Sequence, residues 1–157
     1  NKFNCKMKFK FTLLILLLCA LSSCGYEPIY STKGVNFNIQ EIEVFKKDRL
    51  NKTFKNKIKN YSDSKSDDII SLKINSKKKR QISSKDARGN PKIFNMTISV
   101  ELEVLKAGSI MRNKKFTKNF SYENSSKKFE LRQYEKNIQK NLVDEITDNI
   151  LLYLQSL

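Results

Sequence analysis

The stretch "NMTISVELEVL", residues 95–105, decides the fold of this chain. Apolar and polar side chains alternate along it, which is the period of a β-strand with one buried face and one wet face. The apolar set comprises Met96, Ile98, Val100, Leu102 and Val104, and the polar set comprises Thr97, Ser99, Glu101 and Glu103. The sequence therefore predicts a central strand over 96–104 whose apolar face has to be covered by other elements.

Upstream of this strand the sequence predicts a strand, a helix and a second strand. Residues 35–45 alternate with one shift in phase, which indicates a strand with a bulge. Residues 48–61 place apolar side chains at helical spacing, and Asp48 can cap the helix. Residues 68–76 alternate again, whereas residues 77–91 are polar and end in a Gly-Asn-Pro turn signal, so we expect a loop there.

Downstream of it the sequence predicts a hairpin and a long helix. Residues 106–109, "KAGS", form a short hairpin connection, and residues 110–123 form a weaker, basic strand. Residues 129–157 carry an apolar stripe at helical spacing. Its members are Leu131, Tyr134, Ile138, Leu142, Ile146, Ile150 and Tyr153.

The predicted order, β-α-β-β-β-α, indicates an α+β fold. The first helix supplies a crossover between two parallel strands, and the later strands can form an antiparallel meander. Each helix has one apolar face, so both are expected to cover the same face of the sheet. We predict a single domain over residues 35–157, a two-layer sandwich with a four-stranded mixed sheet and two helices on one face.

The amino-terminal residues are typical of an export signal. Four lysines precede residues 11–21, which are free of charge and too few to span a bilayer. We therefore expect residues 1–23 to be a signal peptide. Met7 opens a well-formed signal, so we interpret residues 1–6 as an upstream extension that need not be translated.

Cys24 follows this segment in a sequence that resembles a bacterial lipobox, Leu21-Ser22-Ser23-Cys24. The resemblance implies that Cys24 becomes the first mature residue and carries acyl chains such as palmitate. The other two cysteines lie in the predicted signal, so the mature chain could form no internal disulfide. Residues 24–34 are expected to be a lipidated linker, and Gly25, in place of an aspartate, favours the outer membrane.

The charge of the chain is strongly positive. The predicted signal holds four of the 31 basic residues and none of the 16 acidic ones, so the mature charge would be +11. Such a balance indicates an anionic partner, namely nucleic acid, anionic lipid or a phosphorylated glycan. Genome composition is an alternative explanation of the positive charge, because residues encoded by A/T-rich codons, lysine among them, are abundant in the sequence. Only a local excess of charge can therefore indicate a site.

The residue types argue against catalysis, cofactors and nucleic acid. The chain has no histidine, which removes the commonest general base and metal ligand. It has neither a glycine-rich phosphate loop nor a serine-centred elbow. The segment "RNKKFTKNFSY", residues 112–122, lacks the glycine-bearing pattern of RNA-recognition modules. We expect no enzymatic activity, no metal and no cofactor, and no nucleic-acid partner.

The mature chain resembles the lipopolysaccharide-assembly outer-membrane lipoprotein family (LptE, also called RlpB). Its start, Cys24-Gly25-Tyr26-Glu27-Pro28-Ile29-Tyr30, is similar to the family's Cys-Gly-aromatic-x-Pro-Leu-Tyr. Glu27 and Ile29 depart from the usual residues. The element order over residues 35–157, the alternating central strand and the long final helix also agree.

The resemblance implies a partner and a role without catalysis. Family members sit inside the large β-barrel lipopolysaccharide translocon (LptD), plug its lumen, assist its assembly and bind lipopolysaccharide. The chain is then expected on the outer membrane, facing the periplasm and the barrel lumen. Two alternatives stay open, an accessory lipoprotein of another envelope lipid transporter and an envelope-structural lipoprotein.

The segment 77–88 is the candidate lipopolysaccharide site. Six basic residues face one acid, Asp86, within twelve positions, and flexible cations at a strand end can converge on phosphates. Family members are thought to bind lipopolysaccharide through basic residues near this junction. The candidates are Lys77, Lys78, Lys79, Arg80, Lys85 and Arg88.

Overall fold

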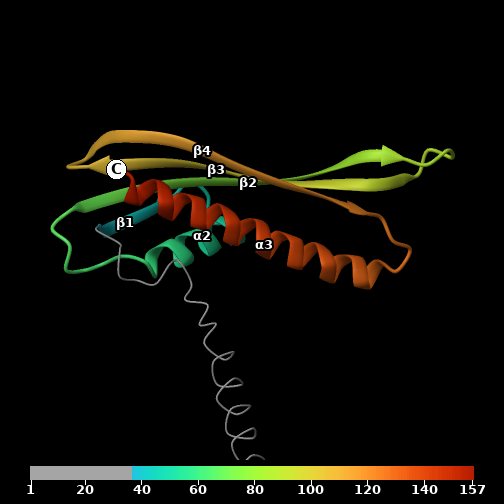
Figure 1. Ribbon diagram of the computed structural model, residues 1–157, viewed down its shortest axis with the longest axis horizontal. Coiled ribbons are helices and arrows are strands. Elements are labelled where there is room, and N and C mark those ends of the chain that lie inside the picture. The colour runs from blue at the N-terminus through green and yellow to red at the C-terminus, as the bar shows by residue number, and fades with distance from the viewer. Residues whose placement is uncertain (1–36) are drawn as a thin grey trace, which may run out of the picture. The chain divides into compact units, whose positions relative to one another are not determined.

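A computed structural model describes residues 37–157, which belong to one compact unit (Figure 1). The predicted signal peptide and linker lie outside these residues. The elements run in the predicted order. They are β1 (Asn38–Val44), α2 (Arg49–Lys59), β2 (Ile69–Lys85), β3 (Pro91–Lys106), β4 (Ser109–Glu123) and α3 (Lys128–Gln155).

The four strands form one mixed sheet in the order β1-β2-β3-β4. β1 pairs parallel to β2 through the α2 crossover, and its register shifts between Ile39 and Glu41, which confirms the predicted bulge. The β2–β3 and β3–β4 pairs are antiparallel. Ala107 and Gly108, both with positive φ, close the β3–β4 hairpin as a two-residue turn.

Both helices pack on one face of this sheet (Figure 1). α2 lies against β1 and β2, and α3 lies against β3 and β4. The apolar residues of β3 predicted to face the core, from Met96 to Val104, are at most 3% exposed. The predicted two-layer α+β sandwich is therefore confirmed.

Asp48 caps α2 as predicted, and its side chain accepts a hydrogen bond from the Asn51 amide at 2.8 Å. The stripe predicted for α3 is confirmed in its aliphatic members, whereas Tyr134 is 47% exposed. Val143, Leu151 and Leu154 are buried as well. The apolar face of α3 is thus wider than a single stripe, because the helix faces both the sheet and α2.

The predicted loop over residues 77–91 is wrong over most of its length. β2 continues to Lys85 and pairs with β3 as far as Pro91, so only residues 86–90 form the turn. The tip of this long hairpin reaches past the N-terminal end of α3 (Figure 1). None of the helices within residues 37–157 is long and apolar enough to cross a membrane.

Candidate functional site

The six candidate cations lie on a β-hairpin, and the pleat of β2 divides them. Lys77 and Lys79 pair with Ser99 and Thr97, on the sheet face that the helices leave open. Lys78 and Arg80 pair with Ile98 and Met96 and therefore point to the helix side. The structure does not bring these four side chains to one point.

The two cations on the helix side already have partners. Lys78 Nζ donates to Gln139 Oε1 of α3 at 2.8 Å. Arg80 Nε donates to Glu135 Oε1 at 2.9 Å and to the Tyr122 hydroxyl at 3.1 Å. Arg80 is therefore a structural residue that ties the hairpin to β4 and α3.

The hydroxyl of Tyr122 closes this network by donating to Glu135 Oε1 at 2.6 Å. Burial and the bond to Glu135 raise the pKa of Tyr122. Burial alone would lower the pKa of Arg80, but its bond to Tyr122 and the charge of Glu135 outweigh burial and raise it. Arg80 therefore stays charged while Tyr122 stays neutral.

Lys85 and Arg88 lie at the hairpin tip, where a carboxylate shapes the turn. Asp86 accepts from the backbone amides of Asn90 at 2.8 Å and Arg88 at 2.9 Å. These bonds, that of Asn90 first, lower the pKa of Asp86. Gly89 supplies the positive φ of 82° that the turn requires. The turn leaves Lys85 and Arg88 exposed to solvent.

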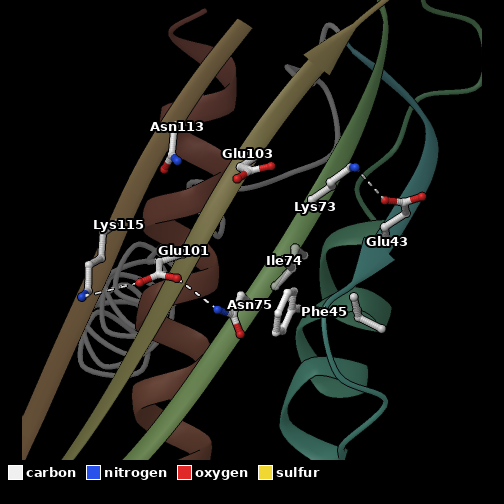
Figure 2. Close-up of a pocket in the computed structure, with 10 residues that line it drawn as sticks. Glu43, Phe45, Lys73, Ile74, Asn75, Glu101, Glu103, Asn113 and Lys115 are labelled. Atoms are coloured by element: carbon white, nitrogen blue, oxygen red, sulfur yellow. Dashed lines mark hydrogen bonds and ion pairs between the residues drawn. The ribbon is translucent and has the colours of Figure 1, made fainter. Parts of the chain in front are cut away.

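The open face of the sheet also carries a shallow concavity of about 590 Å³ (Figure 2). Glu101 lies at its centre, 3.7 Å from Lys115 Nζ, and accepts from Asn75 Nδ2 at 3.0 Å. Glu43 and Lys73 pair at 3.2 Å. With Glu103, three carboxylates and two lysines line the concavity, so it carries a small excess of negative charge and does not favour an anionic ligand.

The sequence matches no family model and no curated protein. Solved structures do match. Rare lipoprotein B from Shewanella oneidensis superposes with a TM-score of 0.55 at 15% identity, over 74% of this chain and 94% of that one. A minor lipoprotein from Acinetobacter baumannii gives 0.58 at 15% identity, over 78% and 92%.

The chain shares the fold of rare lipoprotein B. A putative lipoprotein from Caulobacter crescentus matches as well, with a TM-score of 0.52 at 14% identity, over 73% of this chain and 88% of that one. The resemblance to the LptE/RlpB family is thus confirmed at the level of the fold. Because nearly the whole length of each neighbour is matched, the strands and helices described above make up the rare lipoprotein B fold.

Within residues 37–157 no three Cys, Asp or Glu side chains are close enough to hold a metal ion. The neighbours are described as lipoproteins. Cys24 lies outside the described residues.

Sequence reasoning missed the polar contacts that join the elements of this domain. The Asn51 side chain accepts from the Ser76 amide and hydroxyl, both at 2.8 Å, where β2 runs past the end of β1. In the sequence, this contact is indicated only by the position of Asn51, a polar residue on the apolar side of a predicted helix. No sequence pattern indicates the Tyr122–Glu135 hydrogen bond, because its two residues belong to different elements.

Proposed function

We propose that this chain is an outer-membrane lipoprotein, anchored through Cys24, that plugs and helps assemble the β-barrel lipopolysaccharide translocon and binds lipopolysaccharide during its insertion in the outer leaflet. The observation that carries the proposal is the fold shared with rare lipoprotein B over 74% of the chain. The Cys24–Tyr30 start, which resembles that of the same family, supports it.

The anchor in this proposal is covalent lipid. One acyl chain holds a protein only marginally, whereas two or more, at about 0.8 kcal/mol per buried CH₂ group, give a stable attachment. The domain would then stay at the membrane without a spanning segment of its own. Replacing Cys24 with alanine should abolish palmitate labelling, and unchanged labelling would rule this anchor out.

The open face of the sheet supports the plug role. Along the β2–β3 hairpin it presents hydroxyl and amide side chains such as Thr97, Ser99 and Asn95. The lumen of a membrane β-barrel is polar and hydrated. Lys77 and Lys79 lie among these neutral groups, and water in such a lumen would keep their charges solvated, so the face can lie against the wall without burying an unpaired charge.

Four of the six candidate cations remain available for lipopolysaccharide. Lys77 and Lys79 lie on the open face, and Lys85 and Arg88 lie at the hairpin tip. None of their side chains makes an ion pair within residues 37–157. Each cation near an anionic lipid surface contributes about 1 kcal/mol, which falls with salt.

The partner is tested by purifying the full-length chain from membranes of its host with a mild detergent. The proposal predicts that a large outer-membrane β-barrel protein co-purifies. An inner-membrane lipid transporter in its place would favour an accessory lipoprotein of that transporter. Recovery of the chain alone would favour an envelope-structural role.

The lipopolysaccharide contact is tested by reversing Lys77, Lys79, Lys85 and Arg88 to glutamate together. Binding to purified lipopolysaccharide should weaken by at least tenfold, because about four favourable charges are replaced by unfavourable ones. The matched control reverses four exposed lysines in or beside α2, namely Lys46, Lys47, Lys52 and Lys59. Equal damage from both sets would show that bulk charge alone drives the binding.

A further inference from the structure

A groove of about 670 Å³ lies between α2 and α3 and is lined by an excess of positive charge. Five cations from three elements border it, whereas one carboxylate, that of Asp48, does so. The cations are Arg49 and Lys57 of α2, Lys78 of β2, and Lys136 and Lys140 of α3. Leu50 and Val143 add apolar surface to the same groove.

Little of this positive charge is neutralised by the protein. Lys57 Nζ lies 2.6 Å from Asp144, and Lys78 bonds to the neutral amide of Gln139. Arg49, Lys136 and Lys140 make no ion pair within residues 37–157. Four cations, Lys78 among them, therefore share the groove without an acidic partner.

The carboxylate of Asp48 is committed to capping α2. Its Oδ1 accepts from the Asn51 amide at 2.8 Å, and its Oδ2 accepts from Asn51 Nδ2 at 3.2 Å. It partly balances the positive end of the helix dipole, as an N-cap does. It therefore does little to offset the lysines across the groove.

Two features of the helices bordering the groove are unfavourable unless an anion is present. Lys136 and Lys140 stand at i and i+4 on α3, where like charges repel. The first turn of α2 contains no acidic residue and begins with Arg49, although a helix N-terminus disfavours cations. Both features lie on the same groove, and a bound anion would relieve both.

We propose that this groove binds a phosphate-type oxyanion with more than one negative charge. The guanidinium of Arg49 can donate two hydrogen bonds to such a group, and the lysines can supply further point charges. The anion could be free phosphate or the headgroup of a phosphorylated lipid, since both present the same oxygens. Leu50 and Val143 provide apolar contact for the part of a ligand that carries no charge.

This site is separate from the lipopolysaccharide contact proposed above. That contact uses Lys77 and Lys79 on the open face of the sheet, whereas the groove lies on the helix side. Lys78 is the only member of the 77–88 segment that borders the groove. The two sites can therefore succeed or fail independently.

The test is calorimetric titration of the full-length chain, in nonionic detergent, with inorganic pyrophosphate. We expect Lys136→Gln combined with Lys140→Gln to weaken binding by at least tenfold. Lys52→Gln combined with Lys59→Gln removes the same charge from exposed positions of α2 that do not border the groove. This control should weaken binding by less than threefold, and equal losses would overturn the proposal.

Two further measurements complete the test. Without ligand, the Lys136/Lys140 variant should melt no lower than the wild type, because it loses a repulsion and no partner. Dihexanoyl phosphatidate below its critical micelle concentration serves as the lipid probe. Competition between it and pyrophosphate would indicate a lipid headgroup, and binding of pyrophosphate alone would indicate a free anion. Binding of neither probe would overturn the proposal.

Discussion

The guanidinium carbon of Arg80 lies 3.6 Å from the centroid of the Phe94 ring. The same ring lies 5.8 Å, centroid to centroid, from that of Tyr122, whose hydroxyl bonds to Glu135. Four elements, β2, β3, β4 and α3, are joined in this way. We infer that the cluster fixes the β2–β3 hairpin to the two-layer core.

Replacing Arg80 with alanine should lower the free energy of unfolding by about 1–2 kcal/mol, because it removes a cation–π contact and two hydrogen bonds. Lysine at this position should restore only part of the loss, since it lacks the planar fork. Urea denaturation measures both. The matched control is Lys79→Ala on the open face, and an equal loss there would contradict a specific role for Arg80.

This cluster shows where sequence reasoning fails for the candidate site. Residues 77–85 have no apolar alternation, because both faces of the hairpin are partly wet beyond the core. Lysine also ranks low as a strand former, so the local sequence predicts a loop. Pairing with β3 decides the conformation instead. The partners of Arg80 lie 42 and 55 residues away along the chain, so no local sequence pattern could indicate these contacts.

The core was predictable for the opposite reason. From Met96 to Val104 one face of β3 is buried throughout, so apolar and polar residues alternate in the sequence. The cap at Asp48 and the turn at Ala107–Gly108 are equally local signals. Which face of β2 each lysine occupies could not be predicted in the same way. It depends on how β2 pairs with β3, and the paired residues are distant in sequence.

Replacing Asn51 with alanine should cost about 2–3 kcal/mol of unfolding free energy, because the buried Ser76 amide would lose its acceptor. Asn51 is fully buried and also donates to the Lys46 carbonyl at 3.0 Å. Chemical denaturation gives the value. Asn56→Ala, at an exposed position of the same helix, should change stability little. A small effect at Asn51 would show that water replaces its side chain.

The domain starting near Ser31 should fold cooperatively without its anchor, and Ile98→Asp should abolish that transition. Ile98 is fully buried, and an unpaired charge there should cost more than about 5 kcal/mol, a large part of the stability of a small domain. Circular dichroism during heating reads the transition. Ser99→Asp, on the open face, should stay folded, and the reverse outcome would mean that the two faces are exchanged.

Asp148 should make the domain less stable as the pH rises. Burial, together with the charge of Asp144, raises the pKa of Asp148 above 3.8, so the folded state holds its proton more tightly than the unfolded state. The free energy of unfolding therefore falls as the pH rises from 3.8 through the higher folded value.

Asp148→Asn should accordingly raise the melting temperature near neutral pH, and the gain should vanish below about pH 3, where both states are protonated. Melting curves across this range test it. The exposed Asp67→Asn should show no such dependence. A gain that is the same at every pH would contradict this account of Asp148.

Site-specific photo-crosslinking in living cells tests the plug role most directly. A photoreactive residue would replace Phe45, Ile110 or Phe129 in turn, which are 77%, 61% and 66% exposed and lie beside β1, in β4 and in α3. A domain enclosed by a barrel lumen is surrounded on all sides, so all three positions should cross-link to the same large outer-membrane β-barrel protein. Cross-links from one position only, or from none, would contradict it.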